Sequence, residues 1–418
     1  MNPKLKRIFL ALLFLAIAVG IAVLIFYTFF AAKGPAVTNT NGDSNVNGGT
    51  LPNINGAVPT NYNSNSATNS AVIANTNSGL PVIAEVAAGG LTLTSDLTQQ
   101  AVGHSTSSLD GNGVYYYDYD QSKFFRIAED GLSKSLLSDQ SFYSVSNVIW
   151  SPTKDKAILE YPDGSKIMYD FRNKRQHTLP SEYQEIEFAE NGREIVFKYM
   201  TANEDDRWLA IANPDGTGMQ VVEHMGTKTG NFDVNYSPTG QVVANFKEST
   251  GAEKQEIYFV GKYGENFKSM TVLGKGFESA WAPEGDKMLY SVYSSGTQNK
   301  PSLHVVGAEG ENIGSNMIEL GLNTWPDKCT FSGSSSAICA VPVNLQEGSG
   351  PFRELANDNP DTFWQIDLNT GQKSQLAIPV NSDGSGQFQA GNMFVDETGQ
   401  YLFYTDNYTG RIYKIRLQ

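Results

Sequence analysis

The chain of 418 residues carries 44 aspartate and glutamate residues against 30 lysine and arginine residues, which gives a formal net charge of −14. An excess of that sign repels phosphate backbones and anionic lipid headgroups, so no nucleic-acid partner is predicted. The sequence holds two cysteines, too few to favour a zinc site made of thiolates.

The amino terminus predicts a membrane anchor. Residues 1–7 contain Lys4, Lys6 and Arg7, and a charge-free, mostly apolar run follows at residues 8–32. About 20 such residues span a bilayer, whereas a cleaved signal peptide has a shorter apolar region of roughly 7–15 residues. We therefore expect one transmembrane helix at 8–32, with a cleaved signal as the alternative. The positive charges place residues 1–7 in the cytoplasm as a short stub and the rest of the chain outside the cell membrane, which is crossed once.

Residues 33–80 have a different composition, rich in Asn, Ser, Thr and Gly with scattered Pro. Almost no large apolar side chain is present there to offset the entropy cost of ordering the backbone. This segment is predicted to be a disordered tether between the membrane and the residues that follow.

The remaining residues, 81–418, alternate strand and turn signals without a convincing amphipathic helix. A strand ending in an aromatic residue, a tight turn and a second strand recur about every 40–60 residues, the spacing of stacked four-stranded units. Pro at the second turn position and Gly at the fourth suit such a turn. The clearest copies are Trp150-Ser151-Pro152, Tyr236-Ser237-Pro238-Thr239-Gly240 and Trp281-Ala282-Pro283-Glu284-Gly285.

Weaker copies bring the number of repeats to about seven, and each repeat continues with a strand that runs into an Asp-Gly or Asn-Gly turn. Four antiparallel strands per repeat, arranged radially, predict an all-β fold, a seven-bladed β-propeller. The last repeat lacks its fourth strand, and a spare strand is expected at residues 91–96. We expect this closing strand to complete the last blade beside residues 411–417, which leaves no open edge.

These repeats resemble those of the TolB-like, WD40-like (PD40) β-propeller family, whose hallmark is an aromatic residue followed by Ser-Pro-Asp-Gly. The resemblance covers roughly residues 98–418 and implies an architecture rather than a ligand. TolB has an additional α/β domain before its propeller, and no such domain fits between the tether and the closing strand here. The partners of TolB are therefore not carried over to this chain.

The family pattern also bears on the two cysteines. If the turn around Gly333 follows it, Cys329 lies directly opposite Cys339 in one hairpin. Cross-strand neighbours have Cβ atoms about 4.5–5.5 Å apart, close to what a disulfide needs. An exported protein favours the bond, so a disulfide between Cys329 and Cys339 is predicted, with two buried thiols as the alternative.

No catalytic residue or metal ligand is predicted, because the four histidines form no metalloprotease motif and no Gly-x-Ser-x-Gly elbow is present. Acidic loops at 204–206, 357–361 and 381–384 offer the oxygen ligands that Ca²⁺ takes. Solvated turns are the commoner use of such loops. No cofactor is therefore predicted, and Ca²⁺ is the alternative.

The connections between strands suggest which face binds a partner. In a propeller the turns after the first and third strands emerge on one face. We expect the turns after the first strands to be uniformly short and most of those after the third strands to be equally brief. The connections after the second and fourth strands emerge on the other, here called the loop face, and include long loops at 247–255 and above all at 342–361. Loops on a rigid scaffold are where binding residues concentrate, so the last of these predicts a partner surface, with a disordered insertion as the alternative. Its candidate residues are Phe352, Arg353, Glu354, Asp358 and Asp361.

Together these features favour a non-catalytic binding or scaffolding module, held outside the membrane, whose partner is a protein or a component of the cell envelope. The alternative function is an extracytoplasmic hydrolase or lyase acting on a polysaccharide or peptide. An adaptor subunit of an envelope complex is a third reading. The enzyme reading requires acidic and histidine side chains that converge at the mouth of the ring, which a structure tests directly.

Overall fold

The computed structural model describes residues 82–418, so the predicted stub, transmembrane helix and tether lie outside the described residues. The described chain is all-β, with short 3₁₀ helices in its connections. No helix between residues 82 and 418 is both long and apolar enough to cross a membrane. The 3₁₀ helices are η1 (Glu204–Asp206), η2 (Gly226–Asn231), η3 (Ser295–Thr297), η4 (Gly310–Asn312), η5 (Pro326–Lys328) and η6 (Arg353–Ala356).

Five sheets contain four antiparallel strands each, in chain order. The first two are β2 (Gly103–Ser107), β3 (Gly113–Asp118), β4 (Lys123–Ala128), β5 (Lys134–Leu136), and β6 (Asn147–Trp150), β7 (Lys156–Glu160), β8 (Lys166–Asp170), β9 (Arg175–Leu179). The next two are β10 (Tyr183–Phe188), β11 (Ile195–Tyr199), β12 (Trp208–Ala212), β13 (Gln220–His224), and β14 (Phe232–Val234), β15 (Val242–Gly251), β16 (Lys254–Gly261), β17 (Met270–Leu273). The fifth is β18 (Lys275–Trp281), β19 (Lys287–Tyr293), β20 (Ser302–Gly307) and β21 (Ile318–Glu319).

A sixth sheet has eight strands in the order β22-β23-β24-β25-β1-β28-β27-β26. It contains two meanders joined by the first strand of the described chain. Their strands are β22 (Cys329–Phe331), β23 (Ser336–Pro342), β24 (Asp361–Asp367), β25 (Lys373–Val380), then β26 (Ala390–Val395), β27 (Tyr401–Asp406), β28 (Ile412–Arg416), with β1 (Leu91–Asp96) between them.

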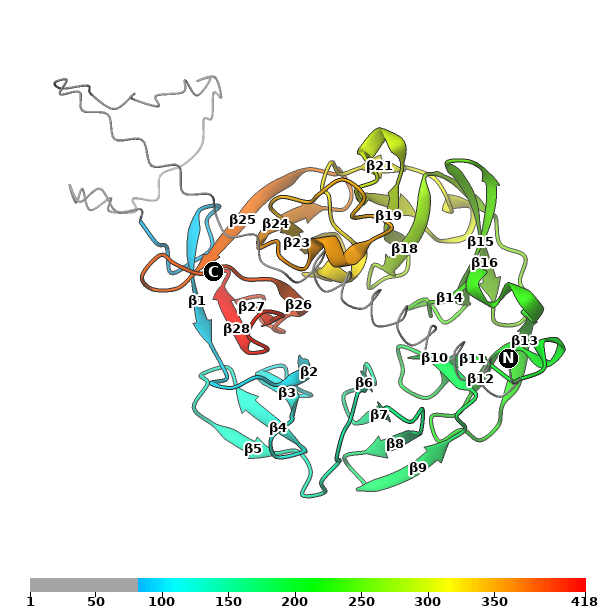
Figure 1. Cartoon of the computed structure of the whole chain (residues 1–418), viewed down its shortest axis with the longest axis horizontal. Coiled ribbons are helices and arrows are strands. Elements are labelled where there is room, and N and C mark those ends of the chain that lie inside the picture. The colour runs from blue at the N-terminus through cyan, green and yellow to red at the C-terminus, as the bar shows by residue number, and fades with distance from the viewer. Residues whose placement is uncertain (1–81) are drawn as a thin grey trace, which may run out of the picture. The chain divides into compact units, whose positions relative to one another are not determined.

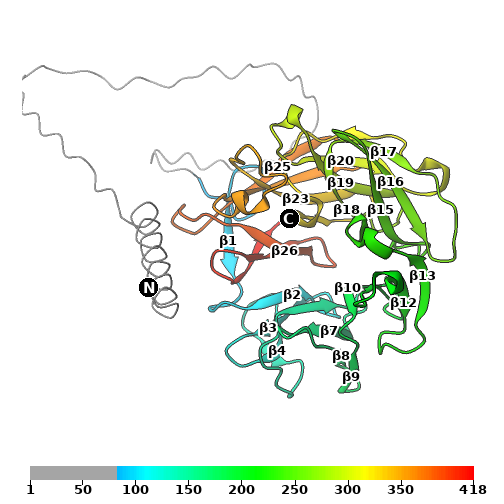
Figure 2. The ribbon, with the colours of Figure 1, turned by 45° about the vertical axis from the view of Figure 1, so that its right-hand side comes forward.

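The meanders follow one another around a ring (Figure 1), and the same order can be followed in Figure 2. The first strand of each meander is the innermost: β2 contacts β6 and β26, β10 contacts β6 and β14, and β22 contacts β26. The remaining links run from β16 to β18 and from β18 to η5, which leads into β22. These contacts return to their starting point, so the ring is closed, as in a β-propeller.

Strand β1 divides its pairing between two meanders. Residues 94–96 pair antiparallel with β28, the contact that the sequence predicts. Residues 91–93 pair in parallel with β25, which the sequence analysis did not anticipate. Just before the strand, the N–H of Ala87 donates to the carbonyl of Arg416 (2.9 Å) and that of Gly89 to Leu376 (2.9 Å). Figure 1 shows blue β1 between orange β25 and red β28.

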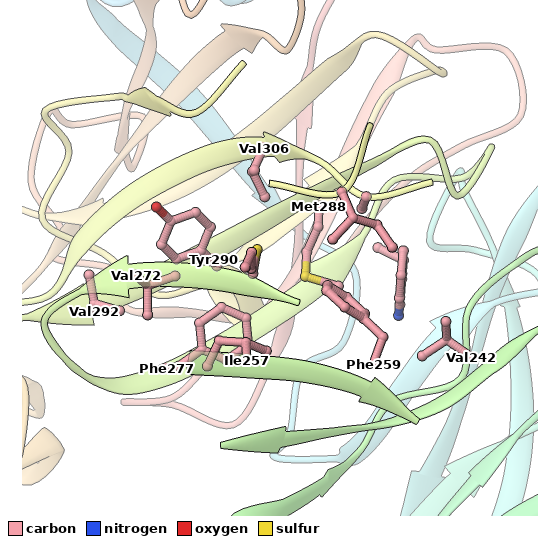
Figure 3. Close-up of a cluster of buried hydrophobic side chains, with 13 residues drawn as sticks. Val242, Ile257, Phe259, Val272, Phe277, Met288, Tyr290, Val292 and Val306 are labelled. Atoms are coloured by element: carbon pink, nitrogen blue, oxygen red, sulfur yellow. The ribbon is translucent and has the colours of Figure 1, made fainter. Parts of the chain in front are cut away.

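The hydrophobic core lies between neighbouring sheets. Figure 3 shows one such cluster, where Ile257 and Phe259 of β16 meet Phe277 of β18 and Met288 and Tyr290 of β19. Similar clusters join each pair of neighbouring meanders, including the last and the first. Burying one such side chain contributes about 1.5–3 kcal/mol, so packing between sheets stabilises the ring.

The repeated turn motif folds as its residues require. Gly240 and Gly285 have φ values of 76° and 75°, a left-handed conformation that glycine adopts without steric cost. The N–H of Gly240 donates to the carbonyl of Ser237 (2.9 Å), and that of Gly285 to Ala282 (2.8 Å), which closes both turns.

One expectation about the connections was wrong. No long loop exists at 247–255, because β15 and β16 continue as a paired ribbon to Gly251 and Lys254, leaving a two-residue turn. Backbone pairing holds such a ribbon without the apolar alternation that marks a buried strand. Most turns after the third strands are short, as expected, and only residues 262–269 and 308–317 form longer connections of this kind within residues 82–418.

Candidate functional site: a central cavity on the loop face

Three carboxylates occupy equivalent positions in three consecutive meanders. Glu185, Asp233 and Glu278 each lie three residues before the aromatic residue of the turn motif. Equivalent positions on radially arranged innermost strands face the same central region. These three residues accordingly line one cavity of about 560 Å³, together with Ile186, Glu187, Val234, Asn235, Lys247 and Ser279.

The cavity lies near the loop-face end of the ring, because the innermost strands start at that face. Several of these strands carry a β-bulge near their start. The bulges contain residues with left-handed backbones, namely His104 (φ 54°), Glu185 (φ 49°), Gly276 (φ 64°) and Asn392 (φ 45°). For a residue other than glycine this conformation costs roughly 1–2 kcal/mol, and bulges re-aim side chains next to functional sites.

Two of the cavity carboxylates are neutralised by lysines of neighbouring strands. Lys198 Nζ lies 2.6 Å from Glu185 Oε2, and Lys247 Nζ lies 2.6 Å from Asp233 Oδ2. Lys198 is almost buried, with 6% of its side chain exposed. A buried ammonium needs a charged partner, so the Glu185 pair fixes both the bulge and the wall of the cavity.

Glu187 differs from these two residues, because within residues 82–418 it forms no ion pair. Its Oε2 accepts a hydrogen bond from the backbone N–H of Tyr236 (3.0 Å), across the boundary between two meanders. Burial raises the pKa of Glu187 to about 7; the Tyr236 N–H opposes the rise, and the nearby Glu190 adds to it. At neutral pH this carboxyl group is therefore divided between its neutral and ionised forms.

Glu278 connects the cavity to the long connection between β23 and β24, residues 343–360, which we call the strap. Arg353 of η6 lies 3.4 Å from Glu278 Oε2 and also pairs with Asp327 of η5. Its guanidinium lies 4.7 Å from the ring centroid of Trp325. Burial raises the pKa of Glu278, Arg353 opposes the rise and Asp327 adds to it. The strap thus reaches the rim of the cavity.

The strap is held by its neighbours on both sides. The N–H groups of Gly348 and Gly350 donate to the carbonyls of Gln298 (3.0 Å) and Asn299 (2.7 Å), in the loop after β19. On the other side, Gln389 Nε2 donates to the carbonyl of Ala356 (2.8 Å). Leu345 and Ala356 of the strap form a small hydrophobic cluster with Trp325. The segment is therefore a packed element of the fold, not the disordered insertion that was the alternative expectation.

The five residues predicted for a partner surface do not lie in one environment. Phe352 is 58% exposed, and Glu354 and Asp358 are also exposed. Arg353 is half-buried in the ion pairs just described. Asp361 is 2% exposed: its Oδ2 lies 2.8 Å from Lys328 Nζ and accepts the Ala390 N–H at 2.7 Å. Asp361 therefore supports the fold, and the strap presents the other four.

The other predicted features are the two cysteines and the acidic loops. Cys329 and Cys339 are directly opposite in β22 and β23, and a disulfide joins them. In the acidic loop at 204–206, Glu204 pairs with Arg207 (3.3 Å). Among residues 82–418, no three histidine, cysteine or acidic side chains are grouped as a metal site would need.

The cavity carboxylates were missed by the sequence analysis, although the sequence contained a signal for them. Phe188, in one of the weaker copies of the turn motif, is equivalent to Tyr236 and Trp281. In all three repeats, the residue three positions before this aromatic residue is acidic. Their ion-pair partners Lys198 and Lys247 lie on the second strands of their meanders, and no sequence motif indicates their positions.

No protein-family model matches this sequence, and no curated protein matches it. Among solved structures, the chain is similar to the β-propeller domain of Cps50 (Swd1) from Myceliophteria thermophila, with 10% identity, a TM-score of 0.51, and coverage of 78% of this chain and 100% of that one. It is similar to an oligogalacturonate lyase in complex with manganese, with 10% identity, a TM-score of 0.50, and coverage of 78% and 93%. TolB from Acinetobacter baumannii matches with 11% identity, a TM-score of 0.41, and coverage of 66% and 63%. At these identities the likeness concerns the fold alone: the chain folds as a β-propeller.

Proposed function

We propose that this protein is a membrane-anchored, extracytoplasmic β-propeller of seven blades that binds a protein or cell-envelope partner without catalysis. The blade number is supported by the five four-stranded sheets and by the two meanders of the eight-stranded sheet, which β1 joins. The anchor and the location rest on the apolar run at residues 8–32 and the positive charges before it.

The observation that carries the proposed binding role is the contact between Arg353 and Glu278. It brings the strap, the longest connection of the loop face, into contact with Glu278, which lines a cavity of about 560 Å³. An exposed aromatic side chain at Phe352 beside charged residues is a composition suited to a protein interface.

A photo-crosslinking amino acid placed at position 352 tests this role in native membranes. We expect it to capture one protein species reproducibly. The matched control is position 263, because Tyr263 is also an exposed aromatic residue (76%) but lies in a turn on the opposite face. Equal capture from both positions, or capture from position 263 alone, would show that the strap does not form the interface.

The enzyme alternative has one observation in its favour. Glu187 and Glu278 line the same cavity, and burial raises the pKa of both carboxyl groups. A pair of carboxyls with perturbed pKa values is the equipment of general acid–base catalysis on glycosidic bonds. Hydrolysis or elimination of a polysaccharide by the purified protein that disappears in Glu187→Gln would replace the binding proposal with this one.

A further inference from the structure

The disulfide between Cys329 and Cys339 lies at the base of the strap. Cys339 is three residues before the end of β23, the strand that leads into the strap. Cys329 is the first residue of β22 and directly follows η5, and its Sγ lies 3.7 Å from the carbonyl oxygen of Trp325. Strand β22 is short, with three residues that pair with residues 337–339. The covalent bond therefore ties η5 to the strand that carries the strap.

The segment that this bond fixes also holds the strap. Asp327 of η5 pairs with Arg353, whose guanidinium lies 4.7 Å from the ring centroid of Trp325. The Nζ of Lys328, the last residue of η5, lies 2.8 Å from Oδ2 of Asp361, the residue that follows the strap. The bond is thus connected through three neighbouring residues to two points of attachment, one within the strap and one at its end.

We propose that the Cys329–Cys339 disulfide is a redox switch for the strap: its reduction frees η6 from η5 while the ring stays folded. This inference rests on the proposed binding role and adds its regulation. One of the hydrophobic clusters between sheets contains the two cysteines, and the other clusters pack without them. The strap has far less apolar packing, because its own cluster consists of Leu345, Ala356 and Trp325. Loss of the bond should therefore act on the strap before the ring.

The switch operates by thiol–disulfide exchange with a dithiol reductant. Cys329 is partly exposed, whereas Cys339 is fully buried, so a thiolate of the reductant attacks Cys329 Sγ. The S–S bond breaks, the Cys339 sulfur leaves as a thiolate and takes a proton from water, and a mixed disulfide forms at Cys329. The second thiolate of the reductant then attacks the reductant's own sulfur in this mixed disulfide. Cys329 leaves as a thiolate and is protonated, and the reductant, having supplied two electrons, becomes a disulfide.

Hydrogen–deuterium exchange of the full chain in a non-ionic detergent, before and after treatment with dithiothreitol, tests the inference. The N–H groups of Leu355, Asn357 and Asn359 donate to carbonyls within the strap. We expect these amides to exchange about tenfold faster after reduction, because the strap then opens locally. The matched control is η2, which is also a 3₁₀ helix in a connection on the loop face. Its exchange rates should stay within about twofold.

Two variants separate the bond from the contacts that it supports. Cys329→Ser combined with Cys339→Ala lacks the bond under both conditions, so its strap should exchange like that of the reduced protein and ignore dithiothreitol. Arg353→Gln removes the ion pair with Asp327 but keeps the disulfide. Its η6 amides should already exchange fast before reduction, and reduction should add less than about twofold, because the two changes act on one contact.

Unchanged exchange in the strap after reduction would overturn the inference, and so would a similar acceleration in η2, which would indicate general loosening. For the regulation, the crosslinker at position 352 should capture about fivefold less partner in the double-cysteine variant than in the native chain, because an unfixed strap loses preorganisation. Equal capture of the partner by both would also overturn it. The proposed function fails by a different result, the absence of capture from position 352 in the native, disulfide-bonded protein.

Discussion

The hydroxyl groups of Thr94 and Tyr404 lie 2.7 Å apart, although 310 residues separate them in the chain. Tyr404 is fully buried, and burial raises the pKa of its phenol well above the usual value. A neutral, buried hydroxyl needs a partner, and the closing strand supplies it. The first strand of the ring is thereby joined to the last meander by a side-chain contact as well as by its backbone.

Thr94→Val should destabilise the protein by about 1–3 kcal/mol, because it leaves the Tyr404 hydroxyl buried without a partner. Thr94→Val combined with Tyr404→Phe removes both hydroxyls and should recover most of that loss. The free energies of unfolding in urea measure both effects. If the double variant instead loses as much stability as the two single variants together, the contact is not a coupled pair.

The disulfide should stabilise the protein modestly. Cys329 and Cys339 are 10 residues apart, and closing a loop of that length in the unfolded chain is worth about 2–3 kcal/mol. Protein purified from outside the cell should have a mass two protons below that of the reduced form. Reduction should lower the unfolding midpoint without changing the sheet signal in circular dichroism, and two free thiols in the purified protein would contradict the prediction.

The ion pair between Lys328 and Asp361 should matter more than its surface counterparts. Both side chains are nearly buried, and the Oδ1 of Asp361 has no partner among residues 82–418. Lys328→Met leaves a buried carboxylate uncompensated and should cost about 3–5 kcal/mol. Adding Asp361→Asn removes that charge and keeps an acceptor for the Ala390 N–H, so stability should return to within about 1–2 kcal/mol of the native protein. Equal stability of the single and double variants would disprove this account.

Glu187 should make stability depend on pH. Its pKa is raised by burial from 4.5 to about 7, so the folded state binds more protons than the unfolded state between these values. The free energy of unfolding should therefore fall as the pH rises through this range, by about 3 kcal/mol at most. Glu187→Gln should remove that part of the slope while keeping an acceptor for the Tyr236 N–H. Urea unfolding at pH 5 and pH 8 checks it; an unchanged slope in the variant would assign the titration elsewhere.

Much of the architecture could be predicted because it depends on local rules. The Pro and Gly positions of the motifs at Tyr236 and Trp281 fix tight turns, and hairpin signals fix the strand order within each repeat. The parallel pairing of residues 91–93 with β25 has no local signature. It depends on where the strand lies between two meanders, which only the closed ring determines.

The candidate site was less accessible to such reasoning. Asp361 looks like any loop carboxylate in the sequence, and its burial follows from Lys328 and Ala390, which are distant in the chain. Glu187 reads as one polar position of an alternating strand. Its raised pKa arises where the neighbouring meander covers it, and strand periodicity contains no information about that contact.

In the proposed arrangement the membrane is attached to the strand that closes the ring. A pull on the chain before residue 82 first reaches Ala84, whose N–H and carbonyl bond to Leu91 (2.9 Å) and Leu93 (2.8 Å). Beyond this contact the tension runs along β1, whose hydrogen bonds to β25 and β28 cross the direction of pull and must break together. A partner held on the loop face and an anchor in the membrane would therefore load the hydrogen bonds of β1 in shear. Loss of the β1 hydrogen bonds would separate the two meanders that β1 joins. Closure of the ring therefore sets the force that the link between partner and membrane can bear.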